Sequence, residues 1–98
     1  MKHFVLFYVY PADFRERRGP FRAAHIAHAG AAVARGELVL GGAFAEDPPE
    51  GMLLFKAETP AVAEAFAAGD PYVQNGVVSS WRVREWTTVV GPEALTKI

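Results

Sequence analysis

The sequence has 98 residues, enough for one compact domain and too few for two. Hydrophobic residues make up 51% and the formal net charge is −1, which favours a folded core and gives no reason to expect nucleic acid. Without cysteine there can be no disulfide or thiolate site, which fits a cytoplasmic location, and no segment approaches the ~20 apolar residues that span a membrane.

The first half of the chain predicts a strand, a polar connection and a helix. Apolar and β-branched residues at 4–10 predict a strand that ends at Pro11. Residues 13–20 are polar and rich in arginine, and we expect a loop or a short turn there. Helical spacing across residues 22–35 predicts a helix that ends at Gly36. Its expected buried stripe consists of Ile26, Ala29 or Gly30, and Val33.

Two further strands and a second helix follow. The strands are expected at residues 38–40 and 52–56, on either side of a turn at 46–51 that is rich in proline. The second helix is expected to begin at Thr59-Pro60, because threonine caps free amides and proline fits the first helical position. Its buried stripe and its end are marked by Val62, Phe66 and Gly69.

The order of elements predicts the architecture. Residues 81–90 alternate as a long fourth strand, before a tail at 91–98. The order β-α-β-β-α-β predicts an α+β, ferredoxin-like fold, in which a four-stranded antiparallel sheet carries two helices on one face. Both sides of the first strand are apolar, so the other sheet face must also contact something. We expect a homodimer, a dimeric α/β barrel whose sheets pack face to face.

His25 and Asp70 are the candidates for chemistry. His25 lies in an alanine-rich helix, and Asp70 opens a turn directly after a second alanine-rich stretch. An imidazole and a carboxylate that meet can orient each other and hold a proton near neutral pH. The alternative for Asp70 is a helix cap in front of Pro71, and one oxygen can cap while the other accepts from the imidazole. The alternative for His25 is a histidine on the helix surface, or one bonded to a carbonyl, without a catalytic role.

A metal site is not expected, although His28 shares a helical face with His25. No acidic residue lies at helical spacing beside them, and a metal needs a third ligand. His28 is therefore expected to be exposed, and His3 carries no functional signal.

Other residues are candidates for contact with a ligand. The one local basic cluster of the sequence consists of Arg15, Arg17, Arg18 and Arg22. It is either a solvated loop partly neutralised by Glu16 or a positive rim for a carboxylate or phenolate substrate, with Arg22 one turn before His25. Gly41-Gly42 can admit a ligand close to the backbone or only permit a bulge. The aromatic candidates, which can equally be core or interface residues, are Tyr8, Phe44, Tyr72 and Trp81.

Four pieces of the chain, spread over residues 3–90, resemble the YCII-related family of small α+β proteins. They are Arg22 with the alanine-histidine helix around His25, Gly36-Glu37-Leu38-Val39-Leu40-Gly41-Gly42, Gly69-Asp70-Pro71-Tyr72-Val73 with Gly76-Val77, and Trp86-Thr87-Thr88-Val89-Val90. The resemblance implies a single YCII-related domain over residues 1–98, a dimeric ferredoxin-like fold and an active site at His25 and Asp70. Some members of the family eliminate chloride from a chlorinated hydroxyquinol. The chain departs from the family in the arginine-rich stretch at 13–20 and in a shorter turn at 45–51, so substrate identity does not transfer.

We therefore expect a small enzyme that needs no cofactor, a lyase or isomerase acting on a cyclic or aromatic molecule. His25 is its general acid or base, and Asp70 holds the imidazole tautomer. The expected substrate contacts are Arg22, Gly42, Phe44, Tyr8, Tyr72 and Trp81. One alternative is a dimeric ligand-binding or interaction module without turnover. Another is a haem-binding or cofactorless monooxygenase; if His25 were an axial ligand, titration with haem would give a strong Soret band.

Overall fold

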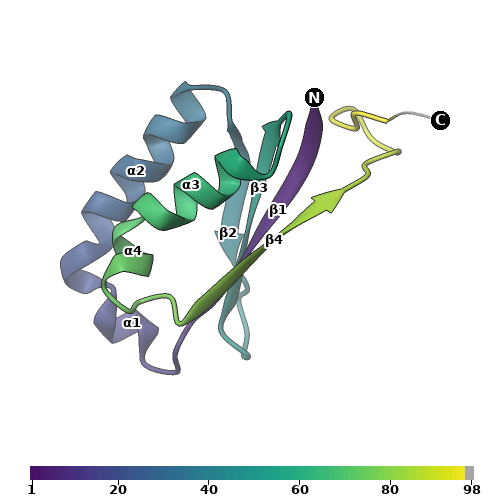
Figure 1. The fold of residues 1–98 in the computed structure, drawn as a ribbon. Helices are drawn as coiled ribbons and strands as arrows, with labels where there is room; N and C mark the ends of the chain where they lie inside the picture. Colours follow the sequence, from purple (N-terminus) through teal and green to yellow (C-terminus); the bar gives the residue numbers. More distant parts are fainter. Residues whose placement is uncertain (97–98) are drawn as a thin grey trace.

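The computed structural model of the protein describes residues 1–96 as an antiparallel sheet with helices on one face (Figure 1). The strands are β1 Lys2–Val9, β2 Leu38–Ala43, β3 Glu50–Ala57 and β4 Ser80–Trp86. The helices are α1 Phe14–Arg17, α2 Arg22–Ala34, α3 Ala61–Gly69 and α4 Pro71–Gln74, with a 3-10 turn at Gly19–Phe21. The strand order is β2-β3-β1-β4 and all three pairs are antiparallel, which confirms the ferredoxin-like α+β fold. None of the helices within residues 1–96 is long and apolar enough to cross a membrane.

The core lies between the sheet and the helices. Alternate residues of β1, Phe4, Leu6 and Tyr8, are buried on the helix side, because successive side chains of a strand point to opposite faces. Phe55 on β3 is the register partner of Phe4 and is also fully buried. The ring of Phe66 on α3 packs against Phe55, with ring centres 5.2 Å apart. This packing holds α3 on the sheet and so positions the turn that follows it.

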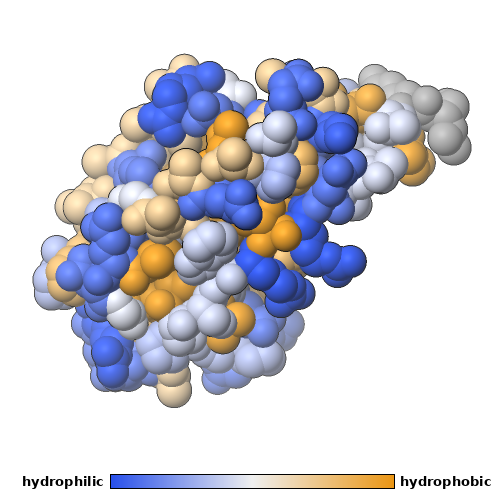
Figure 2. Space-filling model, in the orientation of Figure 1, coloured by the Kyte–Doolittle hydropathy of each residue, from blue (hydrophilic) through white to orange (hydrophobic). Residues whose placement is uncertain are grey.

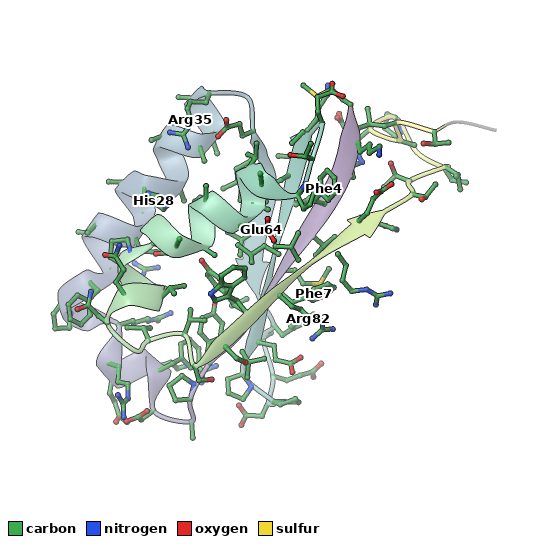
Figure 3. All side chains as sticks on the ribbon, viewed as in Figure 1. Phe4, Phe7, His28, Arg35, Glu64 and Arg82 are labelled. Carbon is green, nitrogen blue, oxygen red and sulfur yellow. The ribbon has the colours of Figure 1, made fainter. Side chains whose placement is uncertain are left out.

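The other face of the sheet carries no helix within residues 1–96 (Figure 1). By register and alternation, its apolar side chains are Val5, Phe7, Val9, Leu40, Met52, Leu54 and Trp86. Arg82 lies on this face with its guanidinium carbon 4.5 Å from the ring centre of Phe7 (Figure 3). On the side of the molecule seen in Figure 2, by contrast, hydrophobic patches are separated by hydrophilic residues. The bare sheet face therefore has an apolar centre within the described part of the chain, with the basic side chains of Arg82, Arg84 and Lys56 on the same face.

The orientation of α2 differs from the expectation. Of the expected buried stripe, Ile26 and Val33 are 54% and 55% exposed, whereas Ala29 is partly buried against the core. The residue of α2 that is fully buried is Ala32, and His28 is half-buried. The small side chains on this face let the helix lie close to its neighbours, which leaves the larger apolar side chains on the outer flank.

His28 was expected to be exposed, and this expectation is wrong because its side chain is on the face of α2 that packs against α3. Its ring lies between α2 and α3, where Nε2 donates a hydrogen bond of 2.9 Å to the carbonyl oxygen of Phe66 (Figure 3). The two rings also pack together, with centres 4.4 Å apart. A Cβ at Gly69 would lie 3.1 Å from Cε1 of His28, so glycine at this position makes room for the imidazole.

The arginine-rich stretch at 13–20 contains α1 and the start of the 3-10 turn, where the sequence predicts a loop or a short turn. Phe14 is the reason, because its side chain is buried and its ring stacks on Tyr10 with centres 4.5 Å apart. A buried aromatic anchor therefore orders this polar segment against the end of β1.

The strand boundaries also differ from the sequence prediction: β1 spans Lys2–Val9 instead of residues 4–10, and β3 spans Glu50–Ala57 instead of residues 52–56. β2 continues through the glycine pair to Ala43, and its irregular register lies between Leu38 and Leu40 and not at the glycines. β4 ends at Trp86 instead of residue 90. After β4 the chain turns at residues 92–93, and the Oγ1 of Thr88 accepts a hydrogen bond of 3.0 Å from the N–H of Leu95 across this turn.

Candidate active site

The structure brings together His25 and Asp70, which lie 45 residues apart in the sequence. His25 lies in the first turn of α2, and its Nδ1 is 2.8 Å and 3.0 Å from the two carboxylate oxygens of Asp70. Asp70 lies between α3 and α4 and is fully buried, with 0% of its surface exposed. The predicted contact between the imidazole and the carboxylate is therefore present.

Three donors surround the Asp70 carboxylate. The Tyr8 hydroxyl donates to Oδ2 at 2.7 Å, and the backbone N–H of Tyr72 donates to Oδ1 at 3.0 Å. The latter bond caps α4, so Asp70 serves as a helix cap and as a partner of His25 at once. Burial by itself would raise the pKa of Asp70, but the bonds from His25, Tyr8 and the Tyr72 N–H outweigh it and hold that pKa below its usual value. The carboxylate is therefore ionised at neutral pH.

This environment determines which nitrogen of His25 is free. An ionised carboxylate only accepts hydrogen bonds, so Nδ1 of His25 carries the hydrogen and donates it to Asp70. In the neutral imidazole the lone pair then lies on Nε2, which bonds to no group of residues 1–96. The Tyr72 ring stacks on the imidazole with centres 3.8 Å apart and planes 3° from parallel. The bond to Asp70 and the stacking on Tyr72 together fix the orientation of the imidazole, and therefore the direction of Nε2.

His25 lines a cavity of about 430 Å³ between α2 and the edge strand β2. Its volume lies in the range of roughly 300–1,000 Å³ that is typical of small-molecule sites. The outer flank of α2 forms one wall, which explains the exposure of Ile26 and Val33. The lining residues in addition to these three are Tyr10, Phe14, Arg18, Arg22, Ala29, Gly30, Leu38, Leu40, Gly41, Gly42, Ala43, Leu53 and Tyr72.

A second hollow, of about 480 Å³, lies on the bare face of the sheet. Its lining consists of Val5, Leu40, Gly41, Gly42, Ala43, Phe44, Met52, Leu54 and Trp86. None of these side chains can accept or release a proton near neutral pH. The cavity beside His25 is therefore the better candidate for chemistry, although it is slightly smaller.

Comparison with known proteins gives the family. The model of the YCII-related domain matches residues 1–87 of the chain. The chain belongs to the YCII-related family. No curated protein sequence matches this YCII-related chain.

Several solved structures share the fold of this YCII-related protein. The 5-chloro-2-hydroxyhydroquinone dehydrochlorinase TftG from Burkholderia phenoliruptrix AC1100, in complex with 2,5-dihydroxybenzoquinone, has a TM-score of 0.72 at 20% identity, over 88% of this chain and 94% of that one. A point mutant of MhuD with manganese protoporphyrin IX bound has a TM-score of 0.53 at 17% identity, over 93% and 97% of the two chains. A NIPSNAP family protein from Agrobacterium tumefaciens C58 has a TM-score of 0.52 at 15% identity, over 97% of both chains. At sequence identities of 15–20%, these similarities show a shared fold and do not by themselves show a shared activity.

Three of the six expected substrate contacts lie at the cavity of the YCII-related protein. Arg22 and Tyr72 line it beside His25, and Gly42 lines it from β2. Beyond Gly42 and its two chain neighbours, no atom of the described residues lies within 4 Å of a Cβ built on Gly42, so this glycine leaves open space at the wall.

The other three residues do not reach the cavity. Tyr8 is fully buried beneath it, and its hydroxyl bonds to Asp70. Phe44 follows β2 and lines the hollow on the bare sheet face. Trp81 lies on β4, at the opposite edge of the sheet from β2. The strand order of the ferredoxin-like sheet places β4 and β2 at opposite edges, which separates Trp81 from the site.

The lining also includes Tyr10 and Phe14, which the sequence did not offer as ligand contacts, and Arg18, a member of the basic cluster expected as either a solvated loop or a positive rim. Burial raises the pKa of Tyr10 to about 12, so its hydroxyl stays protonated at neutral pH. The four-residue spacing of Phe14 and Arg18 is a helical signal that could have placed both on one face of α1 and its cap.

The two histidines of α2 have separate roles. The His25 ring bonds to Asp70, whereas the His28 ring bonds to the Phe66 carbonyl between the helices. Within residues 1–96, no three histidine, aspartate or glutamate side chains gather as metal ligands would.

Proposed function

We propose that this protein is a small enzyme that uses His25 and Asp70 for general acid–base chemistry on a small cyclic or aromatic molecule. The observation that carries the proposal is the His25–Asp70 pair, bonded at 2.8 Å, at the wall of a cavity of about 430 Å³. A positioned base with a free Nε2 and an ionised partner is the arrangement that proton transfer requires.

In the proposed reaction, Nε2 of His25 removes a proton from a carbon atom of the bound substrate. The electron pair of that C–H bond forms a double bond, and either a leaving group departs with its own pair or a proton returns at another carbon. Asp70 stabilises the imidazolium through the bond to Nδ1 while the ring carries the proton. A base of this kind contributes roughly 10²–10⁴-fold, which suffices for elimination or isomerisation of an activated substrate.

The named activity of TftG supports the cyclic substrate class. That relative is called a dehydrochlorinase of 5-chloro-2-hydroxyhydroquinone and was solved with 2,5-dihydroxybenzoquinone. Its activity removes a proton and chloride from a hydroxylated ring, a step within the reach of a histidine base. For the present chain we propose lyase or isomerase chemistry of this kind, and the alternative is a module that binds such molecules without turnover.

We also propose that the protein is a homodimer whose bare sheet faces pack together. The face carries apolar side chains from all four strands, and Trp86 and Met52 on it are 51% and 36% exposed. Exposed apolar patches of this extent are typical of interfaces, and a self-complementary sheet face suits a two-fold dimer.

Turnover of ring substrates tests the proposed function. Chloride release from 5-chloro-2-hydroxyhydroquinone, and deuterium uptake by hydroxylated quinones in D₂O, should both be measured for the wild type, His25→Gln and Asp70→Asn. We expect each substitution to lower the rate by about 10²-fold or more while circular dichroism shows an intact fold. Equal rates in the wild type and His25→Gln would remove the catalytic role. Binding without any turnover in the wild type would favour the alternative module.

A further inference from the structure

The structure separates the arginines near the site into two groups. Arg17 pairs with Asp13, with Nε to Oδ1 at 2.8 Å, and the guanidinium of Arg15 lies over the ring of Phe14. Neither Arg15 nor Arg17 is among the residues that line the cavity. Arg18 and Arg22 line the cavity, and neither forms an ion pair within residues 1–96. The guanidinium groups of Arg18 and Arg22 therefore lie at the cavity, and neither pairs with a carboxylate of residues 1–96.

Tyr72 links these charges to His25. Its ring stacks on the imidazole with centres 3.8 Å apart, and Tyr72 lines the same cavity as Arg18 and Arg22. Burial raises the pKa of Tyr72, although both arginines act against it, so the hydroxyl remains a hydrogen-bond donor at neutral pH.

No acidic side chain of the described residues lines the cavity to compensate these charges. The nearby carboxylate, Asp70, is fully buried and bonded to His25, Tyr8 and the N–H of Tyr72. Away from the arginines the walls are apolar, with Ile26 and Val33 on α2 and Leu53 on β3. The cavity thus has a cationic end with hydrogen-bond donors and an apolar body.

We propose that Arg18, Arg22 and the Tyr72 hydroxyl form a subsite for an anionic oxygen of the ligand, a carboxylate or an ionised phenol on a small apolar ring. The proposal rests on the proposed function in that it names the ligand class of the same cavity. The two guanidinium groups bind the oxygen by charge-assisted hydrogen bonds, and the ring lies along the apolar wall of α2. Where the ring loses a proton to His25, the same donors stabilise the negative charge that spreads onto this oxygen.

Binding of matched probes tests the subsite without any need for turnover. The probes are benzoate against benzamide, and 4-nitrophenolate against nitrobenzene, titrated into the protein by calorimetry and by NMR of the His25 and Tyr72 signals. We expect at least one anion to bind about ten-fold more tightly than its uncharged analogue, as one charge-assisted hydrogen bond provides. The pair that shows the preference tells a carboxylate ligand from a phenolate ligand. No preference in either pair would overturn the proposal.

Variants decide whether the preference comes from the named residues. Arg18→Gln and Arg22→Gln should each lower the affinity for the anion about ten-fold and leave the uncharged analogue unchanged. Arg15→Gln is the matched control, since it removes the same charge from the same stretch but not from the cavity wall. An equal loss in Arg15→Gln would show a general charge effect and overturn the subsite.

His25→Gln separates this proposal from the proposed function. The imidazole is not a member of the subsite, so the variant should retain the preference for the anion while it loses turnover. If turnover survives in His25→Gln, the catalytic role of His25 is contradicted, but the anion subsite is not. Loss of the preference in the arginine variants would still support the subsite in that case.

Discussion

At the scale of single residues, Asp70 is the group on which the site depends. It is fully buried, and it accepts hydrogen bonds from Tyr8, His25 and the N–H of Tyr72. A buried carboxylate remains ionised only while such donors compensate for the lost water. Tyr8, expected among the substrate contacts, therefore acts from beneath the site, as a positioning residue for Asp70.

Replacing Tyr8 with phenylalanine should make the protein less stable and more sensitive to acid. The lost bond to a charged group costs roughly 1–3 kcal/mol of unfolding free energy at neutral pH. The folded-state pKa of Asp70 lies below its unfolded value of 3.8, so its contribution is present above that value and is lost as the pH falls through the folded pKa. In Tyr8→Phe the folded-state pKa rises, so this contribution becomes smaller and disappears at a higher pH. Urea unfolding at a series of pH values measures both effects.

Tyr10→Phe is the control for that change. Tyr10 lies close to Tyr8, with ring centres 6.2 Å apart, but its hydroxyl does not bond to Asp70. If both variants show the same stability at every pH, the bond between Tyr8 and Asp70 has no such role.

At the scale of elements, α2 carries the site because of the way it is rotated. Its inner face holds Ala32 and the half-buried His28, and its outer flank lines the cavity with Ile26 and Val33. His28 bonds to the carbonyl of Phe66 on α3 and so ties the two helices together. That bond, together with the bond of His25 to Asp70, sets the rotation of α2.

Two substitutions on α2 test this orientation. His28→Ala should lower the unfolding free energy by about 1–3 kcal/mol, because it removes a bond between helices and the packing on Phe66. Ile26→Ala should change it by less than about 0.5 kcal/mol, because that side chain is more than half exposed. Chemical denaturation gives both values. A larger loss for Ile26→Ala than for His28→Ala would contradict the described rotation.

At the scale of the whole molecule, the sheet has one face covered by α2 and α3 and one bare apolar face (Figure 1). β2 forms part of both hollows, because Leu40, Gly41, Gly42 and Ala43 line the cavity beside His25 and also the hollow on the bare face. Pairing of two sheets would therefore also restrain one wall of the candidate active site.

Lysine on the bare face should abolish the proposed dimer. Trp86→Lys places a charge in the proposed interface, and burying an unpaired charge costs several kcal/mol, so we expect a monomer in sedimentation equilibrium. Val33→Lys is the matched control, since Val33 is similarly exposed, at 55%, but lies on α2. A wild-type protein that sediments as a monomer, or a Trp86→Lys variant that remains a dimer, would contradict the proposed interface.

The sequence by itself determined the order of elements, the ferredoxin-like fold and the candidate pair His25 and Asp70, because these depend on local periodicity, on capping residues and on a family resemblance. Tertiary structure decided which side of α2 is buried, since that depends on the bonds of His28 and His25 to groups far along the chain. It also decided that the hydroxyl of Tyr8 bonds to Asp70 beneath the cavity and that Arg18 reaches the cavity wall. These facts depend on packing between segments that are distant in the sequence, which no local pattern of residues contains.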